Sequence, residues 1–498
     1  MTRTTPAAIL AFLFIFALGG CGSPTVPDGN ADAAADGSGS DDTASNDAMA
    51  SDSVATDTPA TDAPAADTLN DGSSTGCVPA RAFDDGATYD RTLYVSTTGD
   101  DATGDGTRGR PFASVRVGVS RATPGTRVVL LAGTYRGSVS LSNVSGMPGR
   151  PIALVGEGAV VLDAMGMGEV MHVSDPRYFV LENLTLQNAS VNGLNIDDGG
   201  SIDSPADYVV LRNLRVSNVG TGGNNDCIKL SGVDHFHVLD SDVTGCNAGD
   251  AIDMVGCHDG VIRQNHFHDT VGSGGIQAKG GSARVLIHGN RFVNVNGRAI
   301  NAGGSTGLAF FRPAAAPHEA AEIRVFANVF VRPGNNSGAA IAYVGCDACV
   351  FAQNTLIEPR TFVARILQES IDPRFVPSRN GLFVNNLIVF NYADLRAGTF
   401  VNVGPNTAPA TFVFGSNLWF ALDRPGFTGP VYTDGVPAES MSVIQRDPML
   451  LNRAAGDYHV PLSSPARAAG RAVPGGVPGD FDRSCYATPP TVGAFEAR

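Results

Sequence analysis

Only two of the chain's 34 Lys and Arg residues are lysines, and both lie in one repeating part of the sequence. Lys229 follows Ile228 by one residue, and Lys279 follows Ile276 by three. If these isoleucines point into a core of stacked β-strands, both lysines point outward from one face, two coils or about 10 Å apart. Lysine acts as a general base once its pKa is depressed, which arginine cannot do. We therefore predict that Lys279 or Lys229 abstracts a proton.

Three aspartates lie on the same predicted face. Asp226 and Asp250 begin consecutive strands, and Asp253 takes the outward position that Lys229 takes one coil earlier. Carboxylates this close repel one another unless a cation joins them, and hard oxygen ligands in a flexible cluster suit Ca²⁺. The pattern therefore favours a calcium site. Structural roles stay open, because a strand-start Asp can accept hydrogen bonds from backbone N–H groups and Lys229 can pair with Asp253 across one coil.

This combination of residues fits β-elimination of a uronic-acid polymer. A cation neutralises the sugar carboxylate and acidifies the neighbouring C–H, and a neutral amine removes the proton. Arg298, at another strand start, would help to neutralise the substrate. Gln277 and Asn301 continue the outward column, whereas Arg312 and Arg365 lie in segments outside the plain repeat, where recognition residues are common. We predict that these residues contact an acidic polysaccharide: Gln277, Asn301, Arg312 and Arg365.

Alignment of these residues requires stacked strands, and the sequence repeats with a period near 24 residues. One apolar position recurs at intervals of 34, 24, 24, 24 and 41 residues, at Leu194, Ile228, Ile252, Ile276, Ile300 and Ile341. A second series places Asn at a recurring bend, where its side chain can bond to the next coil: Asn183, Asn213, Asn265, Asn290, Asn328, Asn354 and Asn386. Fixed periods of this size are typical of solenoids. We predict an all-β chain that forms a right-handed parallel β-helix over residues 128–440.

The segment before the repeat predicts a cover for the first coil, whose strand edges would otherwise be open. Pro111–Thr123 places apolar residues on one helical face, and Pro124-Gly125 ends it; these apolar residues are Phe112, Val115, Val117 and Val119. The expected organisation is a strand and short capping helix over 77–127, the solenoid over 128–440, and a C-terminal extension over 441–498 that packs on the solenoid.

Both ends also resemble known β-helix proteins. The stretch from Leu93-Tyr-Val-Ser to Gly133-Thr-Tyr resembles the N-terminal segment of the pectate-lyase-like superfamily. The ending, from Asp447-Pro448 to Val492-Gly-Ala-Phe-Glu496, resembles the tail of bacterial surface β-helix proteins. The resemblance covers roughly residues 90–498. It implies the fold and says little about the activity, because one fold hosts many activities.

The acidic cluster itself looks like that of β-helix polysaccharide lyases that use an Asp-bound Ca²⁺ and a Lys base. This likeness implies metal ligands at Asp226, Asp250 and Asp253 and a base at Lys279. In such lyases the ligand strand often opens with two adjacent acids, whereas here it opens Gly249-Asp250.

Two other functions remain open. The same face could bind glycans without catalysis, in a surface or adhesion protein. Asn225-Asp226-Cys227-Ile228 is also similar to a strand of polygalacturonase-like hydrolases, which need an acid and a base with room for water between them. The Gly-His-Gly and Arg-Ile-Lys motifs of that family are not found in order here.

The N-terminal region predicts export. Arg3 precedes an apolar stretch too short for a permanent membrane span, and Leu18-Gly19-Gly20-Cys21 resembles a bacterial lipobox. We expect a signal peptide over 1–20 and lipidation of Cys21, the alternative being a plain secretory signal. Residues 22–76 hold eleven Asp and no Lys, Arg or Glu, so 21–76 is predicted to be a disordered linker.

These features predict a monomeric bacterial lipoprotein on the outer membrane or cell surface, attached to the membrane only through its lipid anchor. The formal net charge of −15 argues against nucleic acid as a partner, because phosphate binding needs Lys and Arg.

The remaining cysteines and histidines predict no further site. Seven cysteines follow Cys21, so at least one thiol stays unpaired within the chain; Cys346 and Cys349 could close locally. Five of the nine histidines lie between 235 and 268. A zinc site with Cys246 or Cys257 is imaginable, but His235/His237 and His266/His268 fall at different offsets of the coil. We therefore expect structural or solvated histidines.

Overall fold

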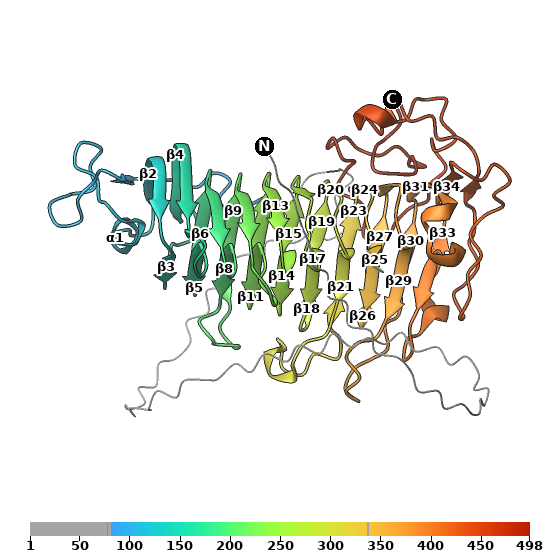
Figure 1. Ribbon diagram of the computed structural model, residues 1–498, viewed down its shortest axis with the longest axis horizontal. Helices are drawn as coiled ribbons and strands as arrows, with labels where there is room; N and C mark the ends of the chain where they lie inside the picture. Colours follow the sequence, from blue (N-terminus) through green and yellow to red (C-terminus); the bar gives the residue numbers. More distant parts are fainter. Residues whose placement is uncertain (1–76, 78–80, 336–337) are drawn as a thin grey trace, which may run out of the picture. The chain divides into compact units, whose positions relative to one another are not determined.

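The computed structural model describes residue 77, residues 81–335 and residues 338–498. The predictions for residues 1–20 and 21–76, lipidation of Cys21 included, lie outside this part of the chain. Parallel strands stack coil upon coil, and each pairs with strands of the coils before and after it (Figure 1). The solenoid has about 12 turns, and a typical turn contains three strands.

One side of most turns contributes a strand to a ten-stranded sheet. Its strands, in spatial order, are β3 (Val139–Ser142), β5 (Met171–Ser174), β8 (Leu194–Asp197), β11 (Ile228–Ser231), β14 (Asp250–Val255), β17 (Gly274–Lys279), β21 (Arg298–Gly303), β25 (Ala339–Val344), β29 (Phe362–Leu367) and β32 (Val401–Val403).

The other two sides form two rows of strands. The first row, called the β6 row, is β6 (Arg177–Glu182), β9 (Ala206–Arg212), β12 (Val233–Leu239), β15 (Val261–Arg263), β19 (Leu286–His288), β23 (Arg324–Phe326), β27 (Val350–Ala352), β30 (Leu382–Val384) and β33 (Val413–Gly415). The second, called the β7 row, is β7 (Thr185–Ala189), β10 (Arg215–Val219), β13 (Asp242–Cys246), β16 (His266–His268), β20 (Arg291–Val293), β24 (Val329–Val331), β28 (Thr355–Ile357), β31 (Leu387–Phe390), β34 (Leu418–Ala421) and β35 (Val443–Ile444).

Long strands at the start join these two rows into one 22-stranded sheet. β1 (Arg91–Val95) pairs with β2 (Thr126–Arg136), and β2 pairs with β4 (Ile152–Asp163), which pairs with both β6 and β7. The shorter elements are β18 (Ser282–Ala283), β22 (Ala320–Ala321), β26 (Cys346–Asp347), η1 (Leu308–Phe310), η2 (Tyr392–Asp394), η3 (Arg396–Gly398), η4 (Pro409–Thr411) and η5 (Arg453–Ala455).

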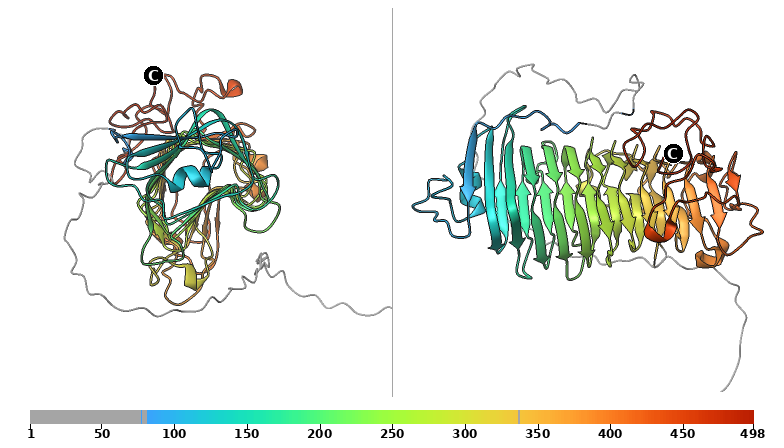
Figure 2. Two further views of the ribbon diagram at one scale, coloured as in Figure 1. Left: turned by 90° about the vertical axis from the view of Figure 1, so that its left-hand side faces the viewer. Right: turned by 90° about the horizontal axis from the view of Figure 1, so that it is seen from above.

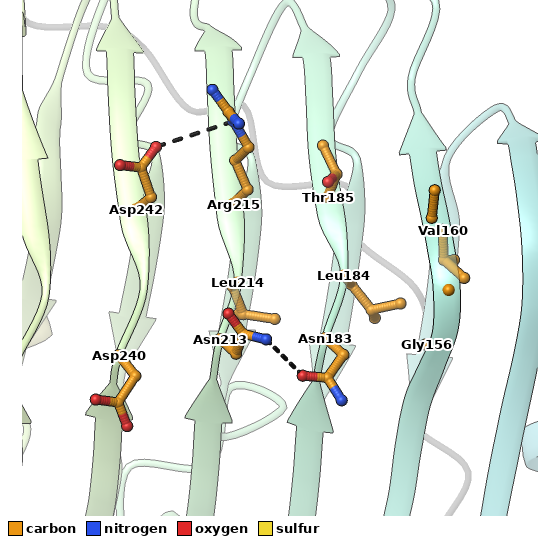
Figure 3. A pocket seen from close by; sticks show the side chains of 12 residues that line it. Gly156, Val160, Asn183, Leu184, Thr185, Asn213, Leu214, Arg215, Asp240 and Asp242 are labelled. Atoms are coloured by element: carbon orange, nitrogen blue, oxygen red, sulfur yellow. Dashed lines mark hydrogen bonds and ion pairs between the residues drawn. The ribbon is translucent and has the colours of Figure 1, made fainter.

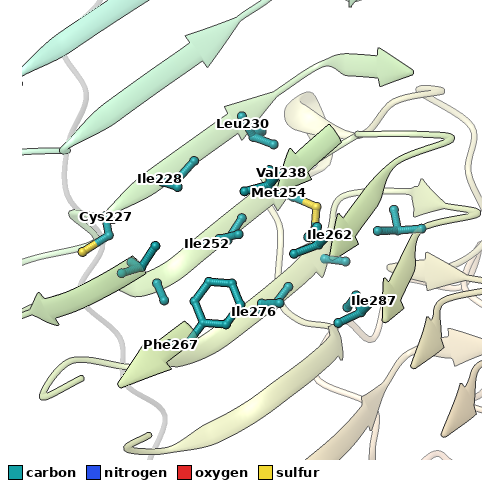
Figure 4. Packing of buried hydrophobic residues seen from close by; sticks show 14 of the residues in the cluster. Cys227, Ile228, Leu230, Val238, Ile252, Met254, Ile262, Phe267, Ile276 and Ile287 are labelled. Atoms are coloured by element: carbon teal, nitrogen blue, oxygen red, sulfur yellow. The ribbon is translucent and has the colours of Figure 1, made fainter. Parts of the chain in front are cut away.

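The core confirms the predicted strand register. The recurring apolar residues are direct partners on successive strands and are all buried: Leu194, Ile228, Ile252, Ile276, Ile300 and Ile341. Figure 4 shows some of them packed with Val238, Ile262 and Ile287 of the β6 row. Because equivalent residues stack with the strand spacing of about 4.8 Å, the residue that follows each of them forms an outward column.

A buried ladder of asparagines joins consecutive coils between the β6 and β7 rows. Its members are Asn265, Asn290, Asn328, Asn354, Asn386 and Asn417. Two residues of the predicted series differ. Asn183 and Asn213 lie one position earlier, with φ of 62° and 49°, a left-handed conformation that Asn tolerates. Their side chains bond to each other near the surface, while Leu184 and Leu214 fill the inner position.

Loss of one ladder rung should destabilise the fold strongly. Asn328 Oδ1 accepts from the backbone N–H and Nδ2 of Asn290, at 2.8 and 3.0 Å, and Asn328 Nδ2 donates to the carbonyls of Ile287 and Phe326. Asn328→Ala leaves these buried groups unpaired, so we expect a loss of about 2–4 kcal/mol in unfolding free energy. Denaturant titration beside the exposed-rung control Asn213→Gly, which keeps a residue suited to the left-handed conformation and is expected to lose under about 1 kcal/mol, checks this. Equal losses would contradict it.

A short helix covers the first coil. α1 (Val115–Ser120) begins after Ser114, whose side chain accepts from the Val117 N–H, and it lies across the N-terminal end of the coils (Figure 2). Val115 and Val119 are buried. The helix is shorter than the predicted 111–123 segment. Ser114 has the extended conformation of an N-cap, so the helix begins only at Val115, and Arg121 is its C-cap.

The end of the chain packs on the β7 row. Tyr458, Val460, Val492 and Phe495 belong to one buried cluster with Leu387 of β31, and this segment lies beside β31 and β34 in Figure 1. Disulfides join Cys77 to Cys485, Cys227 to Cys246 and Cys346 to Cys349. As the odd count requires, one of the seven cysteines has a free thiol; it is Cys257, which is buried.

Candidate functional site

The ten-stranded sheet carries the predicted polar column on its outer side. Asn195, Lys229, Asp253, Gln277 and Asn301 are direct partners on five successive strands. The column continues through Ala342 to Arg365 and Asn402. Three of the four predicted substrate-contact residues therefore share one line along the sheet.

A cluster of buried charges lies in this column; we call Asp226, Lys229, Asp250, Asp253 and Lys279 the Lys–Asp cluster. Lys229 Nζ donates to Asp226 Oδ2 at 3.1 Å and to Asp253 Oδ2 at 3.0 Å. Lys279 Nζ lies 3.3 Å from Asp253 Oδ1. The side chains of Asp226 and Asp253 are fully buried, and those of Lys229 and Lys279 are 20 % and 12 % exposed. Asp253 thus faces one ammonium group at each of its oxygens, with a hydrogen bond at Oδ2 and only an ion pair at Oδ1.

Asp226 also joins neighbouring coils. Its Oδ1 accepts from the Asp250 N–H at 2.8 Å, and its own N–H donates to Asn192 Oδ1 at 2.7 Å. This bonding is the structural role that the sequence left open for a strand-start Asp. Asp226 therefore positions both lysine and backbone, whatever else the cluster does.

The charges of the Lys–Asp cluster balance without a divalent ion. Burial, followed by the charges of Asp226 and Asp253, raises the pKa of Asp250 well above its ordinary value. With a proton on Asp250, two carboxylates face two ammonium groups. Within the described residues, only Asp242, His266 and His268 bring three potential ligand atoms within 4.8 Å of one another.

The predicted calcium ligands consequently do not converge on a common point in this arrangement. The Lys229 ammonium lies between Asp226 and Asp253, where a shared cation would have to sit. In this arrangement Asp226, Asp250 and Asp253 therefore do not form a Ca²⁺ site. Calcium binding by the protein stays a prediction, which the chelator experiment described below tests.

The two lysines differ in the carboxylates that contact them. Burial alone would lower the pKa of Lys229, but the charges of Asp253 and Asp226 outweigh it and raise that pKa above its ordinary value. This opposes the depressed pKa that a lysine base requires. Lys279 faces a single carboxylate oxygen and also contacts Gln277 Oε1 at 3.4 Å. Of the two predicted bases, the geometry favours Lys279.

The raised pKa of Asp226 predicts a pH-dependent stability. Burial first, and then Asp253, raises this pKa from 3.8 to about 6. Stability from protonated Asp226 is therefore fully present below the unfolded pKa of 3.8 and is lost as the pH rises through about 6. Relative to Asp226→Asn, which does not titrate, the wild type should lose on the order of 2–3 kcal/mol across this window. Denaturant midpoints of both proteins against pH measure the gap; a gap that is constant with pH would contradict this assignment.

Two arginines lie beyond the Lys–Asp cluster on the same face. Arg298 donates to Asn301 Oδ1 at 3.2 Å and to Glu369 Oε1 at 2.6 Å. Arg365 donates to Asn402 Oδ1 at 2.9 Å. Burial, followed by the charge of Arg298, lowers the pKa of Arg365 to about 10. Glu369 already supplies a carboxylate to Arg298 and also acts on Arg365, so an anionic sugar that binds both arginines has to replace it.

Arg312 lies apart from this column. Its guanidinium binds both oxygens of Asp234 in β12, at 2.7 and 2.5 Å, and contacts His258 Nδ1 at 2.8 Å. The insert that carries Arg312 is held down by the buried Glu319, which accepts from Gly280 N–H and the Thr306 hydroxyl. Arg312 is therefore engaged by a carboxylate of the fold, which separates it from the other predicted substrate contacts.

A second polar group on this face was missed by the sequence reading. His172 of β5 pairs with Asn195 of β8 in the same column, and its Nε2 lies 2.5 Å from Asp197 Oδ2. Asn195 Nδ2 donates to Glu169 Oε1 at 3.1 Å. The predicted register began at Leu194, one coil too late to include His172. An earlier start, at Met171, would have found it.

Comparison with known proteins identifies the fold. Residues 153–312 match the family described as the right handed beta helix region. The described chain is a right-handed parallel β-helix. This β-helix is similar to the crystal structure of pectate lyase Pel9A, with 15 % identity, a TM-score of 0.51, and coverage of 83 % of this chain and 98 % of that chain. At this identity the likeness concerns the fold alone.

Other solved structures are less similar to the β-helix. An alginate lyase from Paenibacillus sp. str. FPU-7 has 15 % identity and a TM-score of 0.40, with 64 % of this chain and 96 % of that chain covered. A GH136 lacto-N-biosidase from Eubacterium ramulus has 13 % identity and a TM-score of 0.38, with 71 % and 68 % covered. No curated protein matches the sequence. Across the described residues, no helix has the length and apolar character needed to cross a membrane.

Proposed function

We propose that this β-helix is a polysaccharide lyase that cleaves an acidic, uronic-acid polymer on the outer side of its ten-stranded sheet. The observation that carries the proposal is the Lys–Asp cluster, which places the chain's only two lysines beside a continuous polar column. The column offers hydrogen-bonding side chains on successive coils, as an extended polymer requires. The similarity of the fold to a pectate lyase supports the same reading.

In this proposal Lys279 is the base. The Lys279 ammonium first releases its proton to solvent. The neutral amine then takes the proton from the sugar carbon next to the carboxylate, the released electron pair forms a carbon–carbon double bond, and the glycosidic C–O bond breaks. The leaving oxygen takes a proton from water. Arg298 and Arg365 bind the sugar carboxylate, and Gln277 and Asn301 orient the sugar between them and the base. Lys229 stays charged and holds Asp253 in place.

Product chemistry tests the proposal. The full chain is incubated with pectate, alginate and a glycosaminoglycan, with Ca²⁺ or with a chelator. Elimination creates an unsaturated uronate that absorbs in the ultraviolet, whereas hydrolysis creates only reducing ends. Ultraviolet product on one polymer supports the lyase, and its loss with chelator supports calcium assistance. Reducing ends without absorbance would indicate a hydrolase instead.

A non-catalytic glycan-binding surface is the second candidate. The observation that favours it is that both lysines are engaged by buried carboxylates, so the cluster could serve only to shape the face. Retention of a uronic-acid polymer without any product would select this function. Retention should then weaken in Arg365→Ala, because that side chain lies in the column, but not in Arg284→Ala, whose partner Asp259 lies elsewhere.

We also propose that the protein is exported and anchored by a lipid on Cys21. Membrane fractionation tests this, because Cys21→Ser should move the protein from the membrane to the soluble fraction. An unchanged distribution would oppose the lipid anchor.

A further inference from the structure

A group of three potential metal ligands lies on the outer side of the β7 row, on different strands from the Lys–Asp cluster. His266 Nδ1 of β16 lies 3.3 Å from Asp242 Oδ2 of β13, and His268 Nε2 lies 3.3 Å from the same oxygen. The two imidazole rings stack with centroids 4.3 Å apart. Asp242 and His266 are direct partners on adjacent coils, so the solenoid itself brings the three side chains together.

The spacing equals that of ligands around a small tetrahedral ion. Metal–ligand bonds of ~2.0–2.1 Å at tetrahedral angles place the ligand atoms ~3.3 Å apart, which is the distance seen for both histidine–aspartate pairs. Without a cation, Asp242 Oδ2 faces two imidazole nitrogens, His266 Nδ1 and His268 Nε2. Each of these nitrogens must then carry a proton, because otherwise its lone pair would point at a lone pair of the oxygen.

A second carboxylate orients one of the histidines. Asp269 Oδ2 lies 2.9 Å from His268 Nδ1, which places the Nδ1 proton on that side and leaves the Nε2 lone pair directed at the Asp242 side. Asp269 is itself held, because its Oδ1 accepts from Asn294 Nδ2 at 2.8 Å, and Arg332 donates to Asn294 Oδ1 at 2.7 Å. Such outer carboxylates are the usual partners of metal-bound histidines.

We propose that Asp242, His266 and His268 bind one divalent transition-metal ion, with Zn²⁺ as the best fit, and that Asp269 positions His268. One carboxylate and two imidazoles are a zinc ligand set that leaves a fourth position for water or another ligand. The ligand side chains are between 22 % and 41 % exposed, so this fourth position is accessible to solvent.

A polar groove borders the site at Asp242. It has a volume of about 470 Å³, and Asp242 forms part of its lining together with Arg215 and Asp240 (Figure 3). Arg215 Nε lies 3.9 Å from Asp242 Oδ1, whereas the two histidines approach Oδ2. Arg215 lies one coil before Asp242 and His266 one coil after it, so the groove and the three ligands lie on opposite sides of this aspartate.

Metal titration tests the site directly. The full chain is stripped with a chelator, dialysed, and titrated with Zn²⁺ by calorimetry and with Co²⁺ by visible absorbance, since the Co²⁺ spectrum reports the coordination number. We expect one ion per chain and a four-coordinate Co²⁺ spectrum. His266→Gln and His268→Gln should each abolish this binding, and circular dichroism confirms that both variants are folded. Asp269→Asn should weaken it about 10-fold to 100-fold.

The matched control is His235→Gln. His235 is also an outward histidine paired with an aspartate, at 2.7 Å from Asp207 Oδ1, but it belongs to no group of three ligands among the described residues. Its loss should leave the stoichiometry and affinity unchanged. Absence of Zn²⁺ binding in the wild type, or binding that survives both glutamine variants, would overturn the proposal, and it would leave the lyase assay unaffected because that assay concerns another face.

Discussion

Replacement of Lys279 by alanine should reduce the elimination rate on a uronic-acid polymer by about 10²–10⁴-fold, the usual contribution of a positioned general base. The loss should fall on kcat, because the proposed polymer-binding residues, Arg298, Arg365 and the polar column, are unchanged. Lys279 is the more suitable base because its ammonium contacts one oxygen of Asp253, whereas Lys229 is held by two carboxylates that raise its pKa.

Two further variants separate proton transfer from charge. Lys279→Arg keeps a cation beside Asp253 but cannot act as a base at neutral pH, so it should be as inactive as Lys279→Ala while it retains more stability. Arg284→Ala, on an exposed ion pair outside the column, should keep full activity. Initial rates of ultraviolet product formation measure all three. If Lys279→Arg retains activity, Lys279 supplies charge and is not the base. Loss of activity with Lys229→Ala alone would move the base two coils toward the N-terminus, to Lys229.

Removal of Asp253 should cause a large loss of stability. Its two oxygens pair with Lys229 and Lys279, and its side chain is fully buried. Asp253→Ala leaves two largely buried ammonium groups without this partner, so we expect a loss of about 3–5 kcal/mol in unfolding free energy. The exposed pair of Asp259 and Arg284 supplies the control, because Arg284→Ala should cost about 1 kcal/mol or less. Denaturant titration at one pH measures both.

A double variant distinguishes lost charge pairing from lost packing. Lys229 keeps Asp226 as a partner in Asp253→Ala, whereas Lys279 loses the carboxylate that it faces. Lys279→Met removes that ammonium group at similar volume, so Asp253→Ala combined with Lys279→Met should regain part of the stability that Asp253→Ala loses. The coupling energy of such directly contacting groups is commonly about 0.5–3 kcal/mol. Strictly additive losses would show that Asp253 stabilises the sheet through packing alone.

The outcome for the histidines shows where a reading by register is limited. The offsets placed His235/His237 and His266/His268 on different parts of the coil, and the strand partners agree: His237 pairs with Val261, whereas His266 pairs with Asp242. A comparison of histidines only with histidines on other coils misses Asp242. This aspartate lies one coil earlier and forms a group with His266 and His268 of a single strand. Residues two apart on a strand share a face, so the pattern His-x-His with an aligned Asp was the available signal.

The fold could be predicted from the sequence because its determinants are local and periodic. Ile228, Ile252 and Ile276 recur at the coil spacing, and parallel stacking has only one register that buries all of them. Every residue at a fixed offset then follows, which is why Lys229, Asp253, Gln277 and Asn301 were placed correctly in one column. The buried Asn ladder follows from the same repetition, except at Asn183 and Asn213, where a one-residue shift at the bend exchanges Asn for Leu.

Only the tertiary structure decided which groups these side chains contact. The offset of Lys229 in the coil gives the direction of its side chain, but it does not say whether the ammonium group contacts a metal ion, a substrate or a carboxylate. In the structure the long side chain reaches Asp226 and Asp253 together. These two contacts keep Lys229 charged. Likewise, Arg312 binds Asp234, 78 residues away in the sequence, because an insert folds back over the turn. Periodicity therefore determined the positions along the sheet, whereas the reach of flexible side chains and inserts, together with burial, determined the chemistry available at each of them.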